Sequence, residues 1–206
     1  IGNFMADSIK GNKYRKYPEE IQVGILLHRH IDTFTDTHKT FRRSTKRLHK
    51  KYGHYSGVIV DILYDHFLAK NWQNYSDKPL DDYVQNFYDS LEENFEILPL
   101  RIRKMIPFMI TDNWLLSYAS IEGITRVLEG MNRRTKHRSS MNEAVLELET
   151  FYSEFENEFT HFFHELIISS NKTLYLIDIA GPLLGYAESD VDGDEVKYWY
   201  KFRPYE

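Results

Sequence analysis

The chain has 206 residues, a length that fits one compact domain. It carries 26 Lys and Arg against 31 Asp and Glu, and the resulting charge of −5 excludes an overall basic excess for nucleic-acid binding. Cysteine is absent, so any metal ligands must be His, Asp or Glu. The sequence has no apolar run long enough for a membrane span and no signal segment, so we expect a cytoplasmic protein that binds neither nucleic acid nor membrane.

Helices are expected along most of the chain, because apolar residues recur every three or four positions and only six prolines and ten glycines interrupt them. The first long helix is expected over residues 18–50, opening at Pro18 with Glu19 and Glu20 in its first turn and ending before Gly53. Others are expected over residues 55–72, after Pro79, and over residues 100–110, 113–131 and 140–168. The pattern predicts an all-α bundle.

The sequence pattern changes near the C-terminus. Residues 173–179 alternate and are rich in β-favouring types, and residues 196–202 alternate aromatic with charged side chains. We therefore expect one domain over residues 1–169 and an extension over residues 170–206 that forms a strand or hairpin. Asp190, Asp192 and Asp194 lack the glycine and glutamate positions of a calcium loop, so we interpret them as an acidic turn.

Charge is segregated along the sequence. Residues 39–51 hold seven Lys and Arg and no acid, whereas residues 143–165 hold seven glutamates and no Lys or Arg. The basic stretch fits either a solvated helix surface or a docking surface for an anionic partner.

Two groups of polar residues indicate a metal site. His28, Asp32 and Asp36 are spaced four residues apart and project from one side of the first helix, which suits Mn, Mg, Fe or Zn but also fits an ordinary polar face. Asp61 and Asp65 lie in a segment that is apolar all round, so we expect them to be buried in the core, where a carboxylate needs a cationic partner. That partner is either a metal shared with the first helix or an arginine such as Arg29.

Four sequence blocks together resemble the acyl carrier protein phosphodiesterases, also called holo-acyl-carrier-protein hydrolases, a divergent branch of the HD phosphohydrolases. The resemblance covers residues 1 to about 168. The blocks are Gly2-Asn3-Phe4-Met5-Ala6-Asp7; His28-Arg29-His30-Ile31-Asp32 with Thr35-Asp36; Asp61 with Asp65-His66-Phe67-Leu68; and Trp114-Leu115 with Leu128-Glu129-Gly130-Met131 and Arg134.

The resemblance implies an HD-like helical fold and a metal-dependent hydrolysis in lipid metabolism, with manganese expected and magnesium or iron as alternatives. The bond that is cut joins 4'-phosphopantetheine to a serine of acyl carrier protein. The site residues that it implies are Asp7, His28, Asp32, Asp36, Asp61, Asp65 and His66.

We expect distinct roles for these residues. Asp36, His66 and Arg29 are assigned to catalysis, with His66 protonating the leaving oxygen and Arg29 neutralising phosphoryl charge. The expected metal ligands are Asp7, His28, Asp32, Asp61 and Asp65, and the expected carrier-binding residues are Arg43, Arg47 and Arg134. The alternatives are an HD-type hydrolase of a small nucleotide or phosphate ester, and a non-catalytic helical module that binds an acidic partner.

The chain departs from the family pattern in three places. Relatives begin with a further segment of the type Asn-Phe-Leu-Ala-His, whose histidine has no counterpart before Ile1, so we expect an N-terminal segment to be missing. His30 stands where relatives are usually basic, and we rank it below His28 as a ligand. Residues from about 171 onward match nothing in the family pattern.

Overall fold

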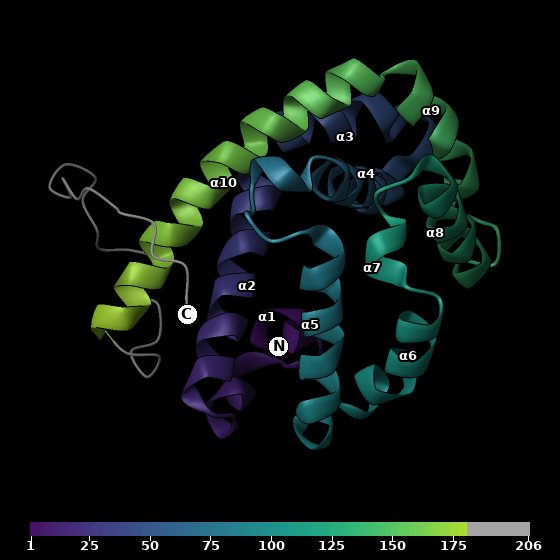
Figure 1. The fold of residues 1–206 in the computed structure, drawn as a ribbon. Helices are drawn as coiled ribbons and strands as arrows, with labels where there is room; N and C mark the ends of the chain where they lie inside the picture. Colours follow the sequence, from purple (N-terminus) through teal and green to yellow (C-terminus); the bar gives the residue numbers. More distant parts are fainter. Residues whose placement is uncertain (181–206) are drawn as a thin grey trace, which may run out of the picture.

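Helices form the regular structure of residues 1–180, which are the residues that the computed structural model describes (Figure 1). No strand occurs among these residues, so the expected all-α class is confirmed for them. The α-helices of this part of the chain are α1 (Gly2–Met5), α2 (Glu19–Thr37), α3 (Lys39–Tyr52), α4 (Ser56–Lys70), α5 (Leu80–Glu93), α6 (Leu100–Thr111), α7 (Trp114–Ser117), α8 (Ile121–Arg134), α9 (Ala144–Thr150) and α10 (Tyr152–Ala180).

Three α-helices of the described residues begin directly after a proline. Pro18, Pro79 and Pro99 precede α2, α5 and α6, with φ angles of −52°, −53° and −56°. The proline ring fixes φ near these values, so the chain enters each helix at a set point. The first turns of α2 and α5 also carry acidic side chains, which interact favourably with the positive end of the helix dipole.

The single helix expected over residues 18–50 is wrong, because the chain breaks at His38 between α2 and α3. His38 has an extended backbone, and its Nδ1 atom accepts a hydrogen bond from the backbone N–H of Thr40, which caps α3. Its ring stacks on Phe34 and meets Phe162 of α10 edge-on, at centroid distances of 5.0 Å and 5.1 Å. These contacts with α10 stabilise the break.

The helices expected over residues 113–131 and 140–168 are also interrupted, the first between α7 and α8 and the second at Phe151. At the first break, the side-chain oxygen of Ser120 accepts a hydrogen bond from the backbone N–H of Gly123, 3.1 Å away. Gly123 lies so close to the carbonyl of Ser117 that no Cβ would fit there. This close approach produces the sharp corner between α7 and α8.

The strand expected over residues 173–179 is wrong, since these residues belong to α10. Thr173 and Ile177 are buried and stand four residues apart, so the buried positions follow the helical period instead of the alternation of a strand. The expected strand over residues 196–202 and the acidic turn of Asp190, Asp192 and Asp194 lie outside the described residues. None of the described helices has both the length and the apolar character that crossing a membrane requires.

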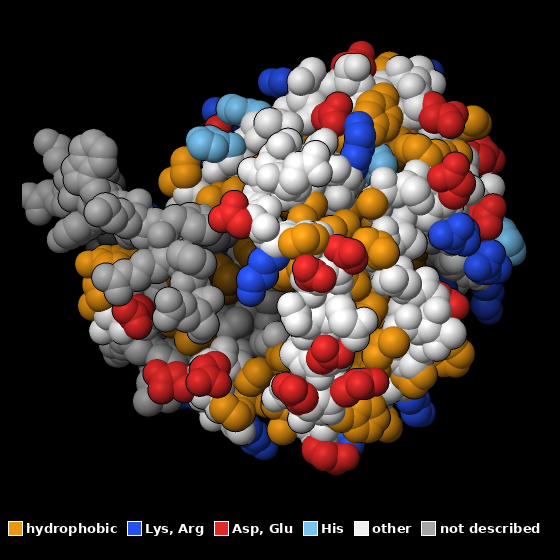
Figure 2. All heavy atoms as spheres, viewed as in Figure 1, with side chains coloured by type: hydrophobic (Ala, Val, Ile, Leu, Met, Phe, Trp, Pro, Cys, Tyr) orange, Lys and Arg blue, Asp and Glu red, His pale blue; other side chains and the backbone are white. Residues whose placement is uncertain are grey.

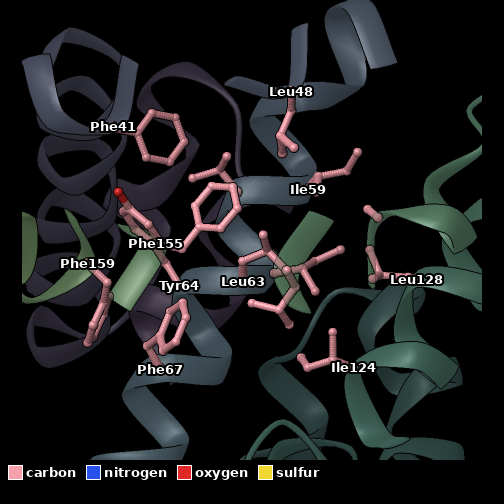
Figure 3. Close-up of a cluster of buried hydrophobic side chains, with 14 of the residues drawn as sticks. Phe41, Leu48, Ile59, Leu63, Tyr64, Phe67, Ile124, Leu128, Phe155 and Phe159 are labelled. Carbon is pink, nitrogen blue, oxygen red and sulfur yellow. The ribbon is translucent and has the colours of Figure 1, made fainter. Parts of the chain in front are cut away.

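Helix α4 lies at the centre of the larger of two hydrophobic cores (Figure 3). Its residues Ile59, Leu63 and Phe67 are fully buried. They pack with buried side chains of α3, α8, α9 and α10, and α10 runs alongside α2 and α3. Burial of these apolar surfaces supplies the main stabilisation of this half of the molecule.

A second core joins the N-terminal segment to α2, α5 and α6. Ile21 and Ile25, on the first turns of α2, are buried in it, whereas Ile31 and Phe34, further along the same helix, pack against the α4 core. Helix α2 therefore spans both cores, and its position is fixed at both ends.

The segregated charges of the sequence meet inside the fold. Arg47 of α3 forms two hydrogen bonds to the carboxylate of Glu158 on α10, at 2.7 Å and 2.8 Å. Lys51 lies 2.9 Å from Glu147 and 3.1 Å from Glu143. Two of the seven cations of the basic stretch, Arg47 and Lys51, therefore pair with the acidic stretch.

We predict that Arg47→Ala lowers the free energy of unfolding by about 2–3 kcal/mol, because it leaves the buried carboxylate of Glu158 without its cation. Lys46→Ala, at an exposed position of the same helix, is the control and is expected to change stability little. Urea denaturation of both variants measures the difference. An equal effect of the two substitutions would show that the ion pair contributes nothing.

The stabilising effect of Arg47 should also depend on pH. Burial alone would raise the pKa of Glu158, but hydrogen bonds from Arg47 and Ser44 outweigh it and hold that pKa below its usual value of 4.5. Without Arg47, burial raises the pKa of Glu158, so the advantage of wild type over Arg47→Ala is full only above that raised pKa. It shrinks as the pH falls and is lost below the lowered pKa of wild type.

Candidate metal centre

The N-terminal segment lies directly on α2 through two glycines. A Cβ atom on Gly24 would lie 2.8 Å from both the Cα of Gly2 and the backbone nitrogen of Asn3, and a Cβ on Gly2 would collide with the carbonyl of Ile21. Only glycine at both positions allows the backbones of α1 and α2 to touch in this way. The contact brings Asn3 and the residues that follow it over the middle of α2.

His28 of α2 is the centre of a small polar cluster. Its Nδ1 atom lies 2.8 Å from the side-chain oxygen of Asn3, and its Nε2 atom lies 3.3 Å from Asp7 and 3.2 Å from Asp32. One ligand atom from each of His28, Asp7 and Asp32 can be chosen so that all three lie within 4.8 Å of one another. Because one imidazole nitrogen and two carboxylate oxygens converge there, the cluster is a candidate site for a divalent cation.

Asn3 fixes which nitrogen of His28 faces the carboxylates. The amide oxygen of Asn3 can only accept a hydrogen bond, so Nδ1 of His28 must donate it. In neutral imidazole the Nε2 atom then carries a free lone pair, directed toward Asp7 and Asp32. This is the usual arrangement of a metal-binding histidine, whose second nitrogen is held by a neighbouring acceptor.

Carboxylates continue from this cluster onto α4. Burial, followed by the charges of Asp36 and Asp32, raises the pKa of Asp61 to about 6. Burial, followed by the charge of Asp61, raises the pKa of Asp65 to about 7. The charge of each carboxylate thus affects the pKa of a neighbouring one. We call Asp7, His28, Asp32, Asp36, Asp61 and Asp65 together the carboxylate row.

The environment of Asp61 and Asp65 differs from the expected one. Helix α4 is buried on most sides, but both residues stand on its solvent-accessible face, so the expectation that they are enclosed in the core is wrong. Surrounding protein still removes enough water to raise their pKa values. Among residues 1–180, no Lys or Arg forms an ion pair with either carboxylate. The row therefore carries unbalanced negative charge.

Arg29 does not form an ion pair with Asp61 or Asp65. Its guanidinium donates hydrogen bonds to the backbone carbonyls of Ile9 and Gly11, at 3.2 Å and 2.7 Å, and lies over the ring of Tyr14. It ties the N-terminal segment to α2. His30 reaches the other side of α2, where its Nε2 atom lies 2.8 Å from the hydroxyl of Ser169 on α10.

His66 is buried next to the row, with 2% of its surface exposed. Its Nδ1 atom lies 2.8 Å from the backbone carbonyl of Tyr118, and its Nε2 atom lies 3.0 Å from the hydroxyl of Tyr152. Burial is the largest cause that lowers the pKa of His66, which favours the neutral ring. Both nitrogens are thus engaged in contacts that join α4 to the α7–α8 corner and to α10.

The three arginines expected to bind the substrate lie in different surroundings. Arg43 is exposed on α3, and Arg47 is held by Glu158. Arg134 is exposed at the end of α8. Burial and the charge of Asp65 raise the pKa of the Tyr118 hydroxyl, and the charge of Arg134 lowers it. Of the three, Arg134 is therefore the one that the structure connects to the carboxylate row.

Sequence reasoning gave no role to two residues that the structure brings to this region. Asn3 belongs to the Gly2-Asn3 block of the family pattern, and its position in that block was the available signal. Tyr118 had no signal, because its contact with His66 runs through its backbone carbonyl.

The described residues thus form a helical fold that gathers an imidazole and carboxylates at one site, which are the ligand types of metal centres in hydrolases. The comparison with known families is more specific. The family model described as acyl carrier protein phosphodiesterase matches residues 1–166, and the chain belongs to this family.

Curated relatives agree with this assignment. The chain is 31% identical over 182 residues to the acyl carrier protein phosphodiesterase of Klebsiella pneumoniae (strain 342), covering 84% of this chain and 91% of the relative. It is 29% identical over 182 residues to that of Photorhabdus laumondii, covering 86% and 90%. With that of Yersinia pestis it shares 30% over 164 residues, covering 79% and 85%. No solved structure matches the chain.

We predict that Asn3→Ala weakens the binding of Mn²⁺ by about 10- to 100-fold, because His28 loses the acceptor that orients its ring. Isothermal titration calorimetry on the metal-free protein measures the dissociation constant. Asn74→Ala, at an exposed position away from the cluster, is the control. Unchanged affinity in Asn3→Ala would remove Asn3 from the metal centre.

Proposed function

We propose that this protein is a metal-dependent phosphodiesterase that releases 4'-phosphopantetheine from the serine of holo-acyl carrier protein and leaves the apo carrier. The observation that carries the proposal is the convergence of His28, Asp7 and Asp32 at one end of the carboxylate row. The family membership and the names of the relatives support the choice of substrate. We further propose that the helical arrangement is a variant of the HD type, with the adjacent Asp65 and His66 in reversed order.

The donor set fits a divalent cation bound mainly by oxygen. Asp7, His28 and Asp32 would hold the ion. Asp61 and Asp65 stand outside this three-residue cluster, and we propose them as further ligands on α4 because the charges of Asp32 and Asp36 act on Asp61 and that of Asp61 acts on Asp65. Manganese suits four carboxylates and one imidazole, and magnesium or iron is the alternative. A divalent cation, when bound, makes a water molecule more acidic and offsets the negative charge of a phosphodiester.

The remaining residues of the site orient these groups. We assign His66 a positioning role instead of the expected proton transfer, because both of its nitrogens are engaged in buried contacts. Arg29 likewise positions the segment that carries Asp7, through the carbonyls of Ile9 and Gly11. Asp36 keeps its proposed place in the catalytic site, since its charge acts on both Asp32 and Asp61.

A carrier protein also needs a docking surface, and the end of α8 provides one. Arg133, Arg134, Lys136 and Arg138 are exposed there in close succession, and Figure 2 shows Lys and Arg side chains gathered over this end of α8. The chain between them has positive φ angles at Lys136 and His137, of 54° and 60°. Buried Asn132 holds this turn through a hydrogen bond to Asn142. We propose that this α8 patch binds the acidic surface of the carrier.

Asp61→Asn and Asp65→Asn are each expected to abolish hydrolysis and to leave the fold intact. Each substitution removes a proposed ligand, and it also removes repulsion among neighbouring carboxylates, so the metal-free variants should melt at or above the wild-type temperature. Loss of the phosphopantetheine arm from holo carrier protein, followed by mass spectrometry in the presence of Mn²⁺, measures the activity.

Asp178→Asn is the control for these variants, because Asp178 is exposed on α10 beyond the matched residues of the family. It is expected to hydrolyse the holo carrier at the wild-type rate. Full activity in both Asp61→Asn and Asp65→Asn would refute the proposed role of α4 in the metal centre. Failure of the wild-type protein to cleave the holo carrier would refute the proposed substrate.

Reversing the charge of the α8 patch should weaken carrier binding. The double variant Lys136→Glu, Arg138→Glu is expected to raise KM for the holo carrier several-fold and to leave turnover of methyl p-nitrophenyl phosphate unchanged, because this small diester does not reach the patch. Wild-type KM for the carrier should rise with salt for the same electrostatic reason. Lys172→Glu on α10 is the control. Equal damage to both substrates would contradict docking at the patch.

A further inference from the structure

An apolar pocket of about 210 Å³ opens next to the carboxylate row. Asp65 forms part of its wall, and the other lining residues come from α4, the turn after it, α5 and the α7–α8 region. Figure 2 shows hydrophobic side chains at the surface where these elements converge. The remaining lining residues are Leu68, Ala69, Trp72, Leu80, Tyr83, Val84, Leu115 and Tyr118.

Contacts among the lining residues and with their neighbours hold the walls of this pocket in place. The indole N–H of Trp72 donates a hydrogen bond to the carbonyl of Lys78 at 2.8 Å, and its ring lies 4.5 Å from that of Tyr83. The backbone of Tyr118 is held by His66. The pocket is therefore formed before any ligand arrives, although Tyr83 keeps 45% of its surface exposed to solvent.

The position of the pocket determines which part of the substrate reaches it. A phosphodiester held at the carboxylate row has two substituents, the serine of the carrier and the pantetheine arm. The serine belongs to a folded protein that cannot enter a pocket of this size, whereas the arm is a narrow flexible chain. Asp65 belongs to both the row and the pocket wall, so the segment attached directly to the phosphate is the one that enters.

The chemistry of the pocket also fits the arm. Leu, Ala, Val and Trp side chains can cover the methyl and methylene groups of pantetheine, and the hydroxyls of Tyr83 and Tyr118 offer partners to its amides. A volume of about 210 Å³ is below the range of about 300–1,000 Å³ that is usual for drug-sized ligands, which favours a thin chain over a nucleotide.

We propose that this pocket binds the pantetheine arm of the carrier and that Ala69 and Tyr83 determine how well the arm fits. This inference rests on the proposed phosphodiesterase function and adds the binding site for the leaving part of the substrate. Ala69 is the smallest residue of the lining, so enlarging it fills the pocket directly. Tyr83 forms an exposed part of the wall, so truncating it opens the pocket and leaves the buried core unchanged.

The test measures Ala69→Phe with two substrates. KM for the holo carrier is expected to rise at least ten-fold, and turnover of methyl p-nitrophenyl phosphate, which has no arm, should stay as in wild type. A second readout uses the metal-free protein and free pantetheine. Saturation-transfer NMR should detect contact of its geminal methyl groups with wild type and lose that contact in Ala69→Phe.

Tyr83→Ala keeps the test decisive where Ala69→Phe does not fold, and it should also raise KM for the holo carrier. Phe108→Ala removes an exposed aromatic residue of α6 outside the pocket and serves as the matched control. Wild-type affinity for the holo carrier and for pantetheine in a folded pocket variant would overturn the inference. A penalty confined to acylated carriers would also overturn it, because the occupant would then be the acyl chain.

These outcomes separate the inference from the function on which it rests. Failure of the wild-type protein to cleave the holo carrier with Mn²⁺ refutes the function. Cleavage by wild type, together with an unaffected pocket variant, refutes the pocket alone.

Discussion

Helices α2 and α4 bring several carboxylates close enough together to repel one another. Asp61 and Asp65 have no ion-pairing Lys or Arg among the described residues. Burial raises the pKa of both; the charges of Asp36 and Asp32 add to the shift of Asp61, and the charge of Asp61 adds to the shift of Asp65. Such a group of like charges destabilises the metal-free fold. The packed apolar side of α4, opposite these carboxylates, offsets that cost, and a bound cation would turn the repulsion into coordination.

The sequence was sufficient to predict the carboxylate row wherever its members share a helix. His28 and Asp32, like Asp61 and Asp65, are four residues apart, and this spacing alone places each pair on one side of its helix. The role of Asn3 could not be found in this way, because its contact with His28 depends on the close approach of α1 to α2. Helical periodicity contains no information about such a contact between separate segments.

The errors in the predicted fold have the same origin. Residues 18–50 have helical periodicity throughout, and the break at His38 is stabilised by Phe162 and Glu165 of α10, far along the sequence. Residues 173–179 favour a strand by composition, but α10 buries Thr173 and Ile177 on one helical face. In both segments tertiary packing outweighed the local preference, which is weak for short stretches.

Internal pairing of charge also decides which surfaces are available for a partner. Glu143, Glu147 and Glu158 pair with Lys51 and Arg47, which are two of the seven Lys and Arg of α3. These two cations therefore serve folding, and the exposed charge at the end of α8 is available for docking. Tyr118, at the α7–α8 corner, connects these parts. His66 contacts the backbone carbonyl of Tyr118, and the side chain of Tyr118 lines the pocket beside Asp65. The charge of Arg134 acts on the Tyr118 hydroxyl. A displacement of this corner would therefore disturb the pocket, the row and the patch together, which is the basis of the positioning role that we propose for His66.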